Sequence, residues 1–179
     1  QVNHPRQYRE FVRRSRPWRA FYAFVKSPAF ITNTLAVLRA HEFDLGLPGP
    51  GLSERLYLRA RALKRGNPMP ITGGNILPHT DHPKKLVTMV IPLLREGEWN
   101  HAWGGGTTVV WPRDRTRIFN RMNHYLGFDE VDQLKTFAFE PNQCLVFIKT
   151  NNSWHAVLPM TGDDPAILRN TLTINIESS

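Results

Sequence analysis

The chain of 179 residues is long enough for one domain with a substantial core, and its contents of 41% hydrophobic and 21% charged residues are ordinary for a globular protein. A single cysteine, Cys144, excludes an internal disulfide and a cysteine-based zinc site, and because it opens an apolar run we expect a buried thiol. No segment predicts a transmembrane helix, since Lys26 interrupts the apolar stretch 20–38, and no signal peptide is evident. We therefore expect a cytoplasmic protein with no membrane partner.

Arginines cluster in three segments, 6–19, 59–65 and 113–121, and contribute to a formal net charge of +8. A basic surface favours anionic partners such as acidic peptides, charged sugars or nucleic acid. No nucleic-acid-binding motif accompanies these arginines, so we prefer a solvated basic surface to a dedicated nucleic-acid site. We expect a small-molecule or peptide substrate, with an anionic one compatible with the charge, and a monomer or weak dimer.

The N-terminal part of the chain predicts helical support over about residues 1–45. Residues 17–40 have an amphipathic helical pattern that directs Phe21, Phe24 and Val25 toward the core. The segment 47–51, rich in proline and glycine, predicts a turn that ends this helical part.

From about residue 55 to 179, short apolar segments are separated by polar turns. This pattern predicts a mainly β barrel, buttressed by the N-terminal helix, in one domain that spans residues 1–179. In chain order, the expected strands are 56–63, 86–93, 107–111, 137–139, 144–150, 154–157 and 169–176, with a loop at 96–106 and a loop or helix at 113–126.

The last predicted strand alternates strictly between apolar and polar residues. Its two faces carry Leu172, Ile174 and Ile176 on one side and Arg169, Thr171, Thr173 and Asn175 on the other. A strand with a polar inward face suits a barrel that encloses a polar ligand.

Three residues have the types and order of a metal site: His79, Asp81 and His155. Two histidines and one carboxylate are the ligand set of non-haem iron sites, in which three protein ligands leave further positions open for substrates and oxygen. In extended backbone alternate side chains share a face, so we expect His79 and Asp81 to point the same way, with Thr80 turned aside. A sheet that folds back must bring His155 close to them.

Arg169, which follows His155 at the start of the last predicted strand, could hold an acidic co-substrate beside that metal. A planar guanidinium can bind a carboxylate through two hydrogen bonds, which a lysine cannot do.

Here the chain resembles the iron(II)- and 2-oxoglutarate-dependent dioxygenases, on the side of the prolyl-hydroxylase-like members. The resembling stretches run in the family's order over roughly the last two thirds of the chain: 77–81 (Leu-Pro-His-Thr-Asp), 85–88 (Lys-Leu-Val-Thr), 104–107 (Gly-Gly-Gly-Thr), 139–142 (Phe-Glu-Pro-Asn), 153–157 (Ser-Trp-His-Ala-Val) and 169–173 (Arg-Asn-Thr-Leu-Thr). One His-x-Asp motif is weak evidence, whereas the ordered set is specific.

The resemblance implies a double-stranded β-helix, a jelly-roll or cupin-like barrel of two sheets. It implies that His79, Asp81 and His155 hold Fe(II) and that 2-oxoglutarate, as co-substrate, chelates this iron. Its far carboxylate would pair with Arg169, helped by the hydroxyl of Thr171 or Thr173. The implied reaction uses O2, hydroxylates a C–H group and releases succinate and CO2, and the aspartate at position 81 argues against halogenation.

Tyr57 and Asn75 could also reach the pocket, from the first strand and from the loop before the metal motif. Two other functions stay open: a cupin-like metal enzyme that uses no keto acid, and a non-catalytic nucleic-acid-binding module on the same fold. Resemblance in the iron site does not establish the substrate, because in such folds specificity lies in variable loops.

Overall fold

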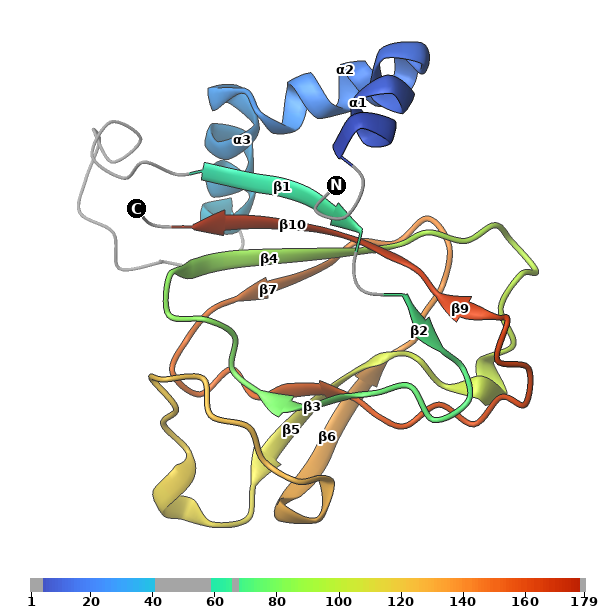
Figure 1. Ribbon diagram of the computed structural model, residues 1–179. Helices are drawn as coiled ribbons and strands as arrows, with labels where there is room; N and C mark the ends of the chain where they lie inside the picture. The colour runs from blue at the N-terminus through green and yellow to red at the C-terminus, as the bar shows by residue number, and fades with distance from the viewer. Residues whose placement is uncertain (1–4, 41–58, 66–67, 178–179) are drawn as a thin grey trace.

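A computed structural model describes residues 5–40, 59–65 and 68–177. Its helices lie over a pair of antiparallel sheets (Figure 1). The helices are α1 (Pro5–Arg14), α2 (Arg16–Val25) and α3 (Pro28–Ala40), followed by the 3-10 helices η1 (His101–Trp103), η2 (Arg115–Arg117) and η3 (Phe128–Glu130). The strands are β1 (Arg59–Arg65), β2 (Met69–Pro70), β3 (Ile76–His79), β4 (Lys85–Pro92), β5 (Thr107–Pro112), β6 (Val131–Phe137), β7 (Leu145–Ile148), β8 (His155–Val157), β9 (Leu168–Arg169) and β10 (Thr171–Glu177).

The amphipathic segment predicted near the N-terminus is helical, but it divides into α2 and α3. The hydroxyl of Ser27 accepts a hydrogen bond from the backbone N–H of Phe30 at 3.3 Å, and Pro28 stands at the first position of α3, so a new helix starts there. Val25 is fully buried as expected, whereas Phe24 is 47% exposed, so its predicted core position is wrong. Its ring instead packs edge-on against the core residue Phe30, with the centroids 5.5 Å apart, and stays partly open to solvent.

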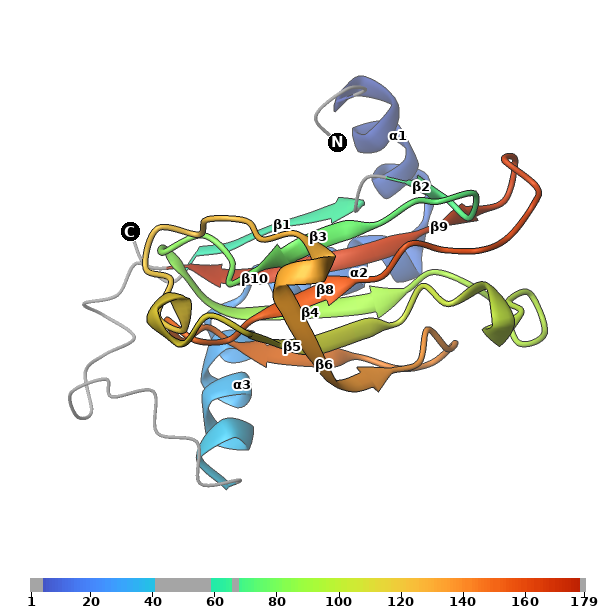
Figure 2. The ribbon, with the colours of Figure 1, turned by 90° about the horizontal axis from the view of Figure 1, so that it is seen from below.

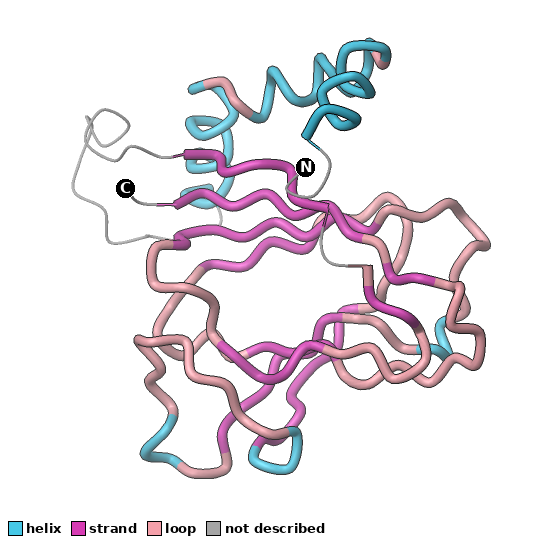
Figure 3. The backbone as a smooth tube through the Cα atoms, viewed as in Figure 1, coloured by secondary structure: helices cyan, strands magenta, loops and turns pink. Residues whose placement is uncertain are grey.

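Two four-stranded sheets form the body of the fold, in the orders β1-β10-β4-β7 and β3-β8-β5-β6, with β2 and β9 as a small third sheet. Every strand pair is antiparallel. Seen from below, the β3-β8-β5-β6 sheet lies in front of the other (Figure 2), and loops join the two at both ends (Figure 3). The mainly β fold with helical support is confirmed. In the described residues no ladder joins the two four-stranded sheets, so the closed barrel is not formed there.

The main core lies between the helices and the outer face of the β1-β10-β4-β7 sheet. Its buried residues come from helix and strand alike: Val25, Phe30, Leu38, Val87, Met89, Leu172, Ile174 and Ile176. The alternation predicted for the last strand is confirmed, because every second residue of β10 belongs to this core. The intervening polar residues therefore point between the two sheets.

A second core covers the outer face of the other sheet. Trp154 is 2% exposed and packs there with Val110, Val131 and Leu126, and its indole N–H donates to the backbone carbonyl of Ile118 at 2.7 Å. The loop between β5 and β6 thus stabilises the strand that carries His155.

Two expectations are wrong in detail. Cys144 is exposed, because it precedes the edge strand β7 instead of lying within it. The strand predicted at 137–139 is β6, which covers Val131–Phe137; most of its residues are exposed, so they carry no apolar alternation.

Within the described residues no single helix has the length and apolar content to cross a membrane, and the one combination that has both, α2 with α3, is bent by 66°.

Candidate metal centre

His79 and His155 are direct neighbours on adjacent strands. His79 ends β3, His155 begins β8, and the antiparallel register pairs them. Their ring centroids are 4.4 Å apart. On their outer sides the rings stack against Tyr125 and Phe147 respectively, with centroids 5.4 Å and 4.6 Å apart. The sheet register therefore brings the distant histidine to the first one, as the sequence predicted.

Asp81 reaches the histidines through a turn. Its backbone has φ of 71°, in the left-handed region that non-glycine residues rarely adopt. The sequence predicted that His79 and Asp81 would share a face of extended backbone, and that reason is wrong, although the side chains do converge. Thr80 is turned aside as expected: it is fully buried, and its hydroxyl donates to the carbonyl of Asn120 at 2.9 Å.

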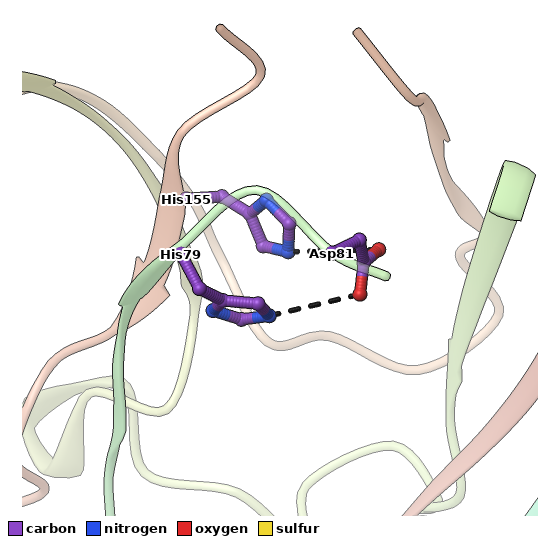
Figure 4. Close-up of side chains that lie close together, drawn as sticks. All are labelled: His79, Asp81 and His155. Atoms are coloured by element: carbon purple, nitrogen blue, oxygen red, sulfur yellow. Dashed lines mark ion pairs between the residues drawn. The ribbon is translucent and has the colours of Figure 1, made fainter. Parts of the chain in front are cut away.

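Three ligand atoms of this triad point at one place (Figure 4), all within 4.8 Å of one another. The Nε2 atom of His79 lies 3.7 Å from one carboxylate oxygen of Asp81, and the Nε2 atom of His155 lies 4.0 Å from the other. Each Nδ1 faces a backbone carbonyl, that of Leu77 at 2.8 Å and that of Ser153 at 2.9 Å. A neutral ring that donates from Nδ1 keeps the Nε2 lone pair free for a metal.

The charges of the triad suit metal binding. Burial alone would raise the pKa of Asp81, but His79 and the ammonium of Lys85 together hold it well below its usual range. Burial, with a smaller contribution from His79, lowers the pKa of His155 to about 4. At neutral pH the triad therefore offers an ionised carboxylate and a neutral His155 imidazole, the forms that bind a divalent metal.

Residues behind Asp81 fix the orientation of its carboxylate. The Nζ atom of Lys85 donates to Oδ1 at 2.6 Å, and the buried hydroxyl of Thr88 lies 3.1 Å from Oδ2. That hydroxyl is also 3.0 Å from the side-chain oxygen of Asn175 on β10. Strands β4 and β10 thus hold the ligand that the left-handed turn presents.

A cavity of about 450 Å³ opens in front of the triad. Its walls come from both four-stranded sheets and from the β2-β9 pair: Met69, Asn75, Ile76, His79, Asp81, Lys85, Thr88, Val90, Thr107, Phe147, His155, Ala156, Val157, Arg169, Thr171 and Thr173. Among these residues the only acid is Asp81.

Arg169 is a buried cation in the wall of this cavity. It is 4% exposed, its Nε atom donates to the carbonyl of Gly105 at 2.6 Å, and its guanidinium lies 4.6 Å from the ring centroid of Phe139. Burial lowers its pKa to about 10, so it remains charged at neutral pH. Among the described residues no carboxylate lies within ion-pair distance of it. A buried guanidinium with no carboxylate partner among the described residues favours the binding of an anion beside it.

The glycine run 104–106 makes room for this arginine. Gly105 has φ of 80°, and a Cβ there would lie 2.7 Å from the Trp99 ring and 3.5 Å from the Cδ atom of Arg169. The positive φ and the Trp99 ring therefore require glycine at this position, whose carbonyl accepts the hydrogen bond from Arg169.

The other predicted site residues have different outcomes. Thr171 and Thr173 lie on the cavity-facing side of β10, the first buried and the second half-buried. Asn75 is exposed at the cavity edge, where its amide N–H donates to the carbonyl of Gly73 at 3.0 Å. Tyr57 lies outside the described residues.

The sequence did not identify several residues of the cavity as site residues, above all Lys85, Thr88 and Thr107. Alternation along the predicted strand 86–93 would have put Thr88 and Val90 on one face, so Thr88 could have been found from the pattern. Lys85 precedes that predicted strand, and only the fold brings its side chain to Asp81.

No protein-family model matches the chain, and no curated protein matches it. The resemblance read from the motifs therefore stays a prediction, and the geometry of the site is the basis for any function.

Proposed function

We propose that the protein is an Fe(II)- and 2-oxoglutarate-dependent dioxygenase that hydroxylates a C–H group of a small molecule or of a residue on a larger molecule. The observation that carries this proposal is a single cavity that holds both a two-histidine, one-carboxylate triad and a buried arginine with no carboxylate partner among the described residues. The triad fits iron by its donor atoms, and the arginine fits a dicarboxylate.

The donor set supports iron over a structural metal. Two imidazole nitrogens and one carboxylate oxygen leave further coordination positions open, as an oxygen-activating site needs. Bound iron with its keto acid would activate O2, with release of succinate and CO2. His79, Asp81 and His155 would hold the metal.

Arg169 would bind the far carboxylate of 2-oxoglutarate. Thr171, next but one on the chain, lines the same cavity and can donate a hydroxyl hydrogen bond there, as can Thr107 from β5. The aromatic rings of Tyr125 and Phe147, which pack against the two histidines, would shield the metal side from water.

The strand order supports a double-stranded β-helix as the fold behind this site. Among the strands of the two four-stranded sheets, each strand lies in the other sheet from the one before it along the chain, except for the consecutive strands β5 and β6, and the resulting orders are β1-β10-β4-β7 and β3-β8-β5-β6. Interleaving of this kind is the arrangement of a two-sheet jelly roll, in which ligands bind between the sheets.

Anaerobic titration of the metal-free protein with Fe(II) and 2-oxoglutarate tests the proposal. We expect the weak visible charge-transfer band of an iron–keto-acid chelate in the wild type and none in His79→Ala. The His82→Ala variant is a matched control, because His82 is exposed and next to the triad. A folded wild-type protein that forms no band would contradict the proposal.

The same titration distinguishes the proposed function from the alternative of a metal enzyme that uses no keto acid. It predicts metal binding that is indifferent to 2-oxoglutarate and to loss of Arg169. The burial of Arg169 in the cavity wall favours the keto-acid function over this alternative.

A further inference from the structure

Lys85 is a second cation of the cavity, and the proposed reaction leaves it without a function. Its Nζ atom donates to Asp81 at 2.6 Å, and its side chain is 22% exposed. Asp81 is its only ion-pair partner in the described part of the chain.

Lys85 lies far from Arg169. In the register of β4 with β10, Lys85 pairs with Glu177, whereas Pro92 pairs with Thr171, which is adjacent to the arginine end. The two cations therefore stand at opposite ends of β10. A dicarboxylate held by Arg169 leaves Lys85 at the metal end.

The charges of the loaded site do not balance. Without a metal, Lys85 and Asp81 form a neutral pair. When a divalent metal takes Asp81 as a ligand, the ammonium and the metal share one carboxylate at close range, and their mutual repulsion is strong in a partly buried site. With Arg169 and a dianionic co-substrate included, one positive charge remains at the metal end.

Lys149 adds a second positive charge nearby. It follows β7, its backbone N–H donates to the carbonyl of Leu86 at 2.9 Å, and its side chain is half-buried. Burial lowers the pKa of Lys149, and the negative charge of Asp81 partly opposes this lowering. Its Nζ atom donates to the carbonyl of Thr150, and among the described residues it has no carboxylate partner.

We infer that the primary substrate of this site carries a carboxylate, which binds to Lys85 beside the metal. The inference rests on the proposed function. An ammonium has three donors and Lys85 uses one for Asp81, so it can donate to a second carboxylate without leaving the first. A single carboxylate balances the one positive charge that remains among the groups of the loaded cavity, whose wall does not include Lys149. Free organic acids and acidic side chains share this chemistry.

Matched ligands on the anaerobic Fe(II)–2-oxoglutarate complex test the inference. The probes are propanoate, benzoate and phenylacetate, each with its primary amide, and a blocked glutamate peptide with its glutamine counterpart. A shift of the visible band reports binding near the metal, whereas loss of the band reports displacement of the co-substrate. The small acids and the peptides distinguish the two sources of the carboxylate.

We expect the best carboxylate to bind at least about tenfold more tightly than its amide. Lys85→Met should abolish this preference, and Lys85→Arg should retain it. Lys84→Met is the matched control, because Lys84 is exposed and does not line the cavity, and it should behave as the wild type. If Lys85→Met forms no band, Lys85→Gln keeps a donor to Asp81 and removes the charge.

Two results would overturn the inference: carboxylates that bind no better than amides, including the case in which neither binds, or a preference that survives removal of the Lys85 charge. Absence of the band in the wild type would instead contradict the proposed function, so the two failures are distinguishable.

Discussion

Arg169 is the residue that most sharply separates the proposed function from other metal chemistry. It is buried and charged, and within the described part of the chain its side chain donates to the Gly105 carbonyl and lies over the Phe139 ring. An isolated buried cation destabilises a fold unless an anion joins it, so we interpret Arg169 as a binding residue whose cost is offset by its ligand.

Arg169→Met should weaken 2-oxoglutarate binding by about 100-fold to a few thousand-fold, because the buried carboxylate would lose a partner that contributes roughly 3–5 kcal/mol. Metal affinity should be unchanged. Calorimetric titration of the metal-free protein with Mn(II), followed by titration of the Mn(II)-loaded protein with 2-oxoglutarate, measures the two affinities. Arg95→Met is the control, since Arg95 is exposed and only loosely paired with Glu98. Equal co-substrate affinity in both variants would remove Arg169 from the site.

His79→Ala should weaken Fe(II) binding by more than about 100-fold, because even residues behind metal ligands contribute roughly 10- to 100-fold. His82→Ala should have no effect. Quenching of tryptophan fluorescence during anaerobic titration measures the affinities. Similar affinities for the two variants would contradict the triad.

At the residue scale the sequence predicted the triad well, because ligand types and order survive without knowledge of the fold. It did not predict how Asp81 arrives: the left-handed backbone at Asp81 is stabilised by contacts of Thr80 with a loop 40 residues away. It also did not predict Lys85, since that ion pair depends on the turn. The types and order of the ligands can be read from the sequence, whereas the way in which their side chains approach one another depends on long-range packing.

At the scale of elements, the glycine run before β5 links the loop 96–106 to the cavity. Gly105 and Gly97 have nearly the same φ, 80° and 78°, but only Gly105 has neighbours that a Cβ would meet. Substitutions at these two glycines therefore distinguish the effect of backbone strain, which both share, from the effect of contact with the site, which only Gly105 has.

Gly105→Ala should weaken 2-oxoglutarate binding by about tenfold or more, because the added methyl group would displace Trp99, whose ring packs against Phe139, and Phe139 in turn lies under the Arg169 guanidinium. Gly97→Ala should leave binding unchanged, although each variant should lose about 1–2 kcal/mol of stability from its left-handed alanine. Thermal unfolding and calorimetry provide the two readouts. Parallel losses of affinity would show that strain alone is responsible.

The elements themselves were largely predictable where burial imposes a period. Strands β4, β5 and β10 were expected within a few residues, because one face of each packs in a core. Strand β6 was mostly missed, since its residues are exposed and its position depends on pairing with β5. The break between α2 and α3 was missed because the amphipathic pattern runs on through Pro28, and proline is tolerated at the start of a helix.

At the scale of the whole molecule, acid should destabilise the metal-free protein. The pKa of His155 falls to about 4 in the folded state, so between about pH 6.5 and 4 the unfolded chain binds a proton that the folded chain does not. Stability should therefore decrease as the pH falls through this window, by about 3 kcal/mol from this group. Asp81, whose pKa is lowered, adds its own loss only below its ordinary value near 3.8.

Urea unfolding at pH 7, 5.5 and 4, with a chelator present, measures this dependence. His155→Gln should show a smaller loss over the same range, by about 3 kcal/mol. Curves that run parallel for the two proteins would contradict the buried, neutral state of His155.

Strand β10 has a consequence for how such a protein can change over evolutionary time. Its leucine and isoleucines pack under the helices, while the threonines between them line the cavity. Alternate residues of this one strand therefore contribute to the core and to the cavity wall. Under the proposed function, substitutions on the cavity side would change ligand choice without touching the residues that hold the domain together, so new specificities would be accessible in single steps from a scaffold that stays folded.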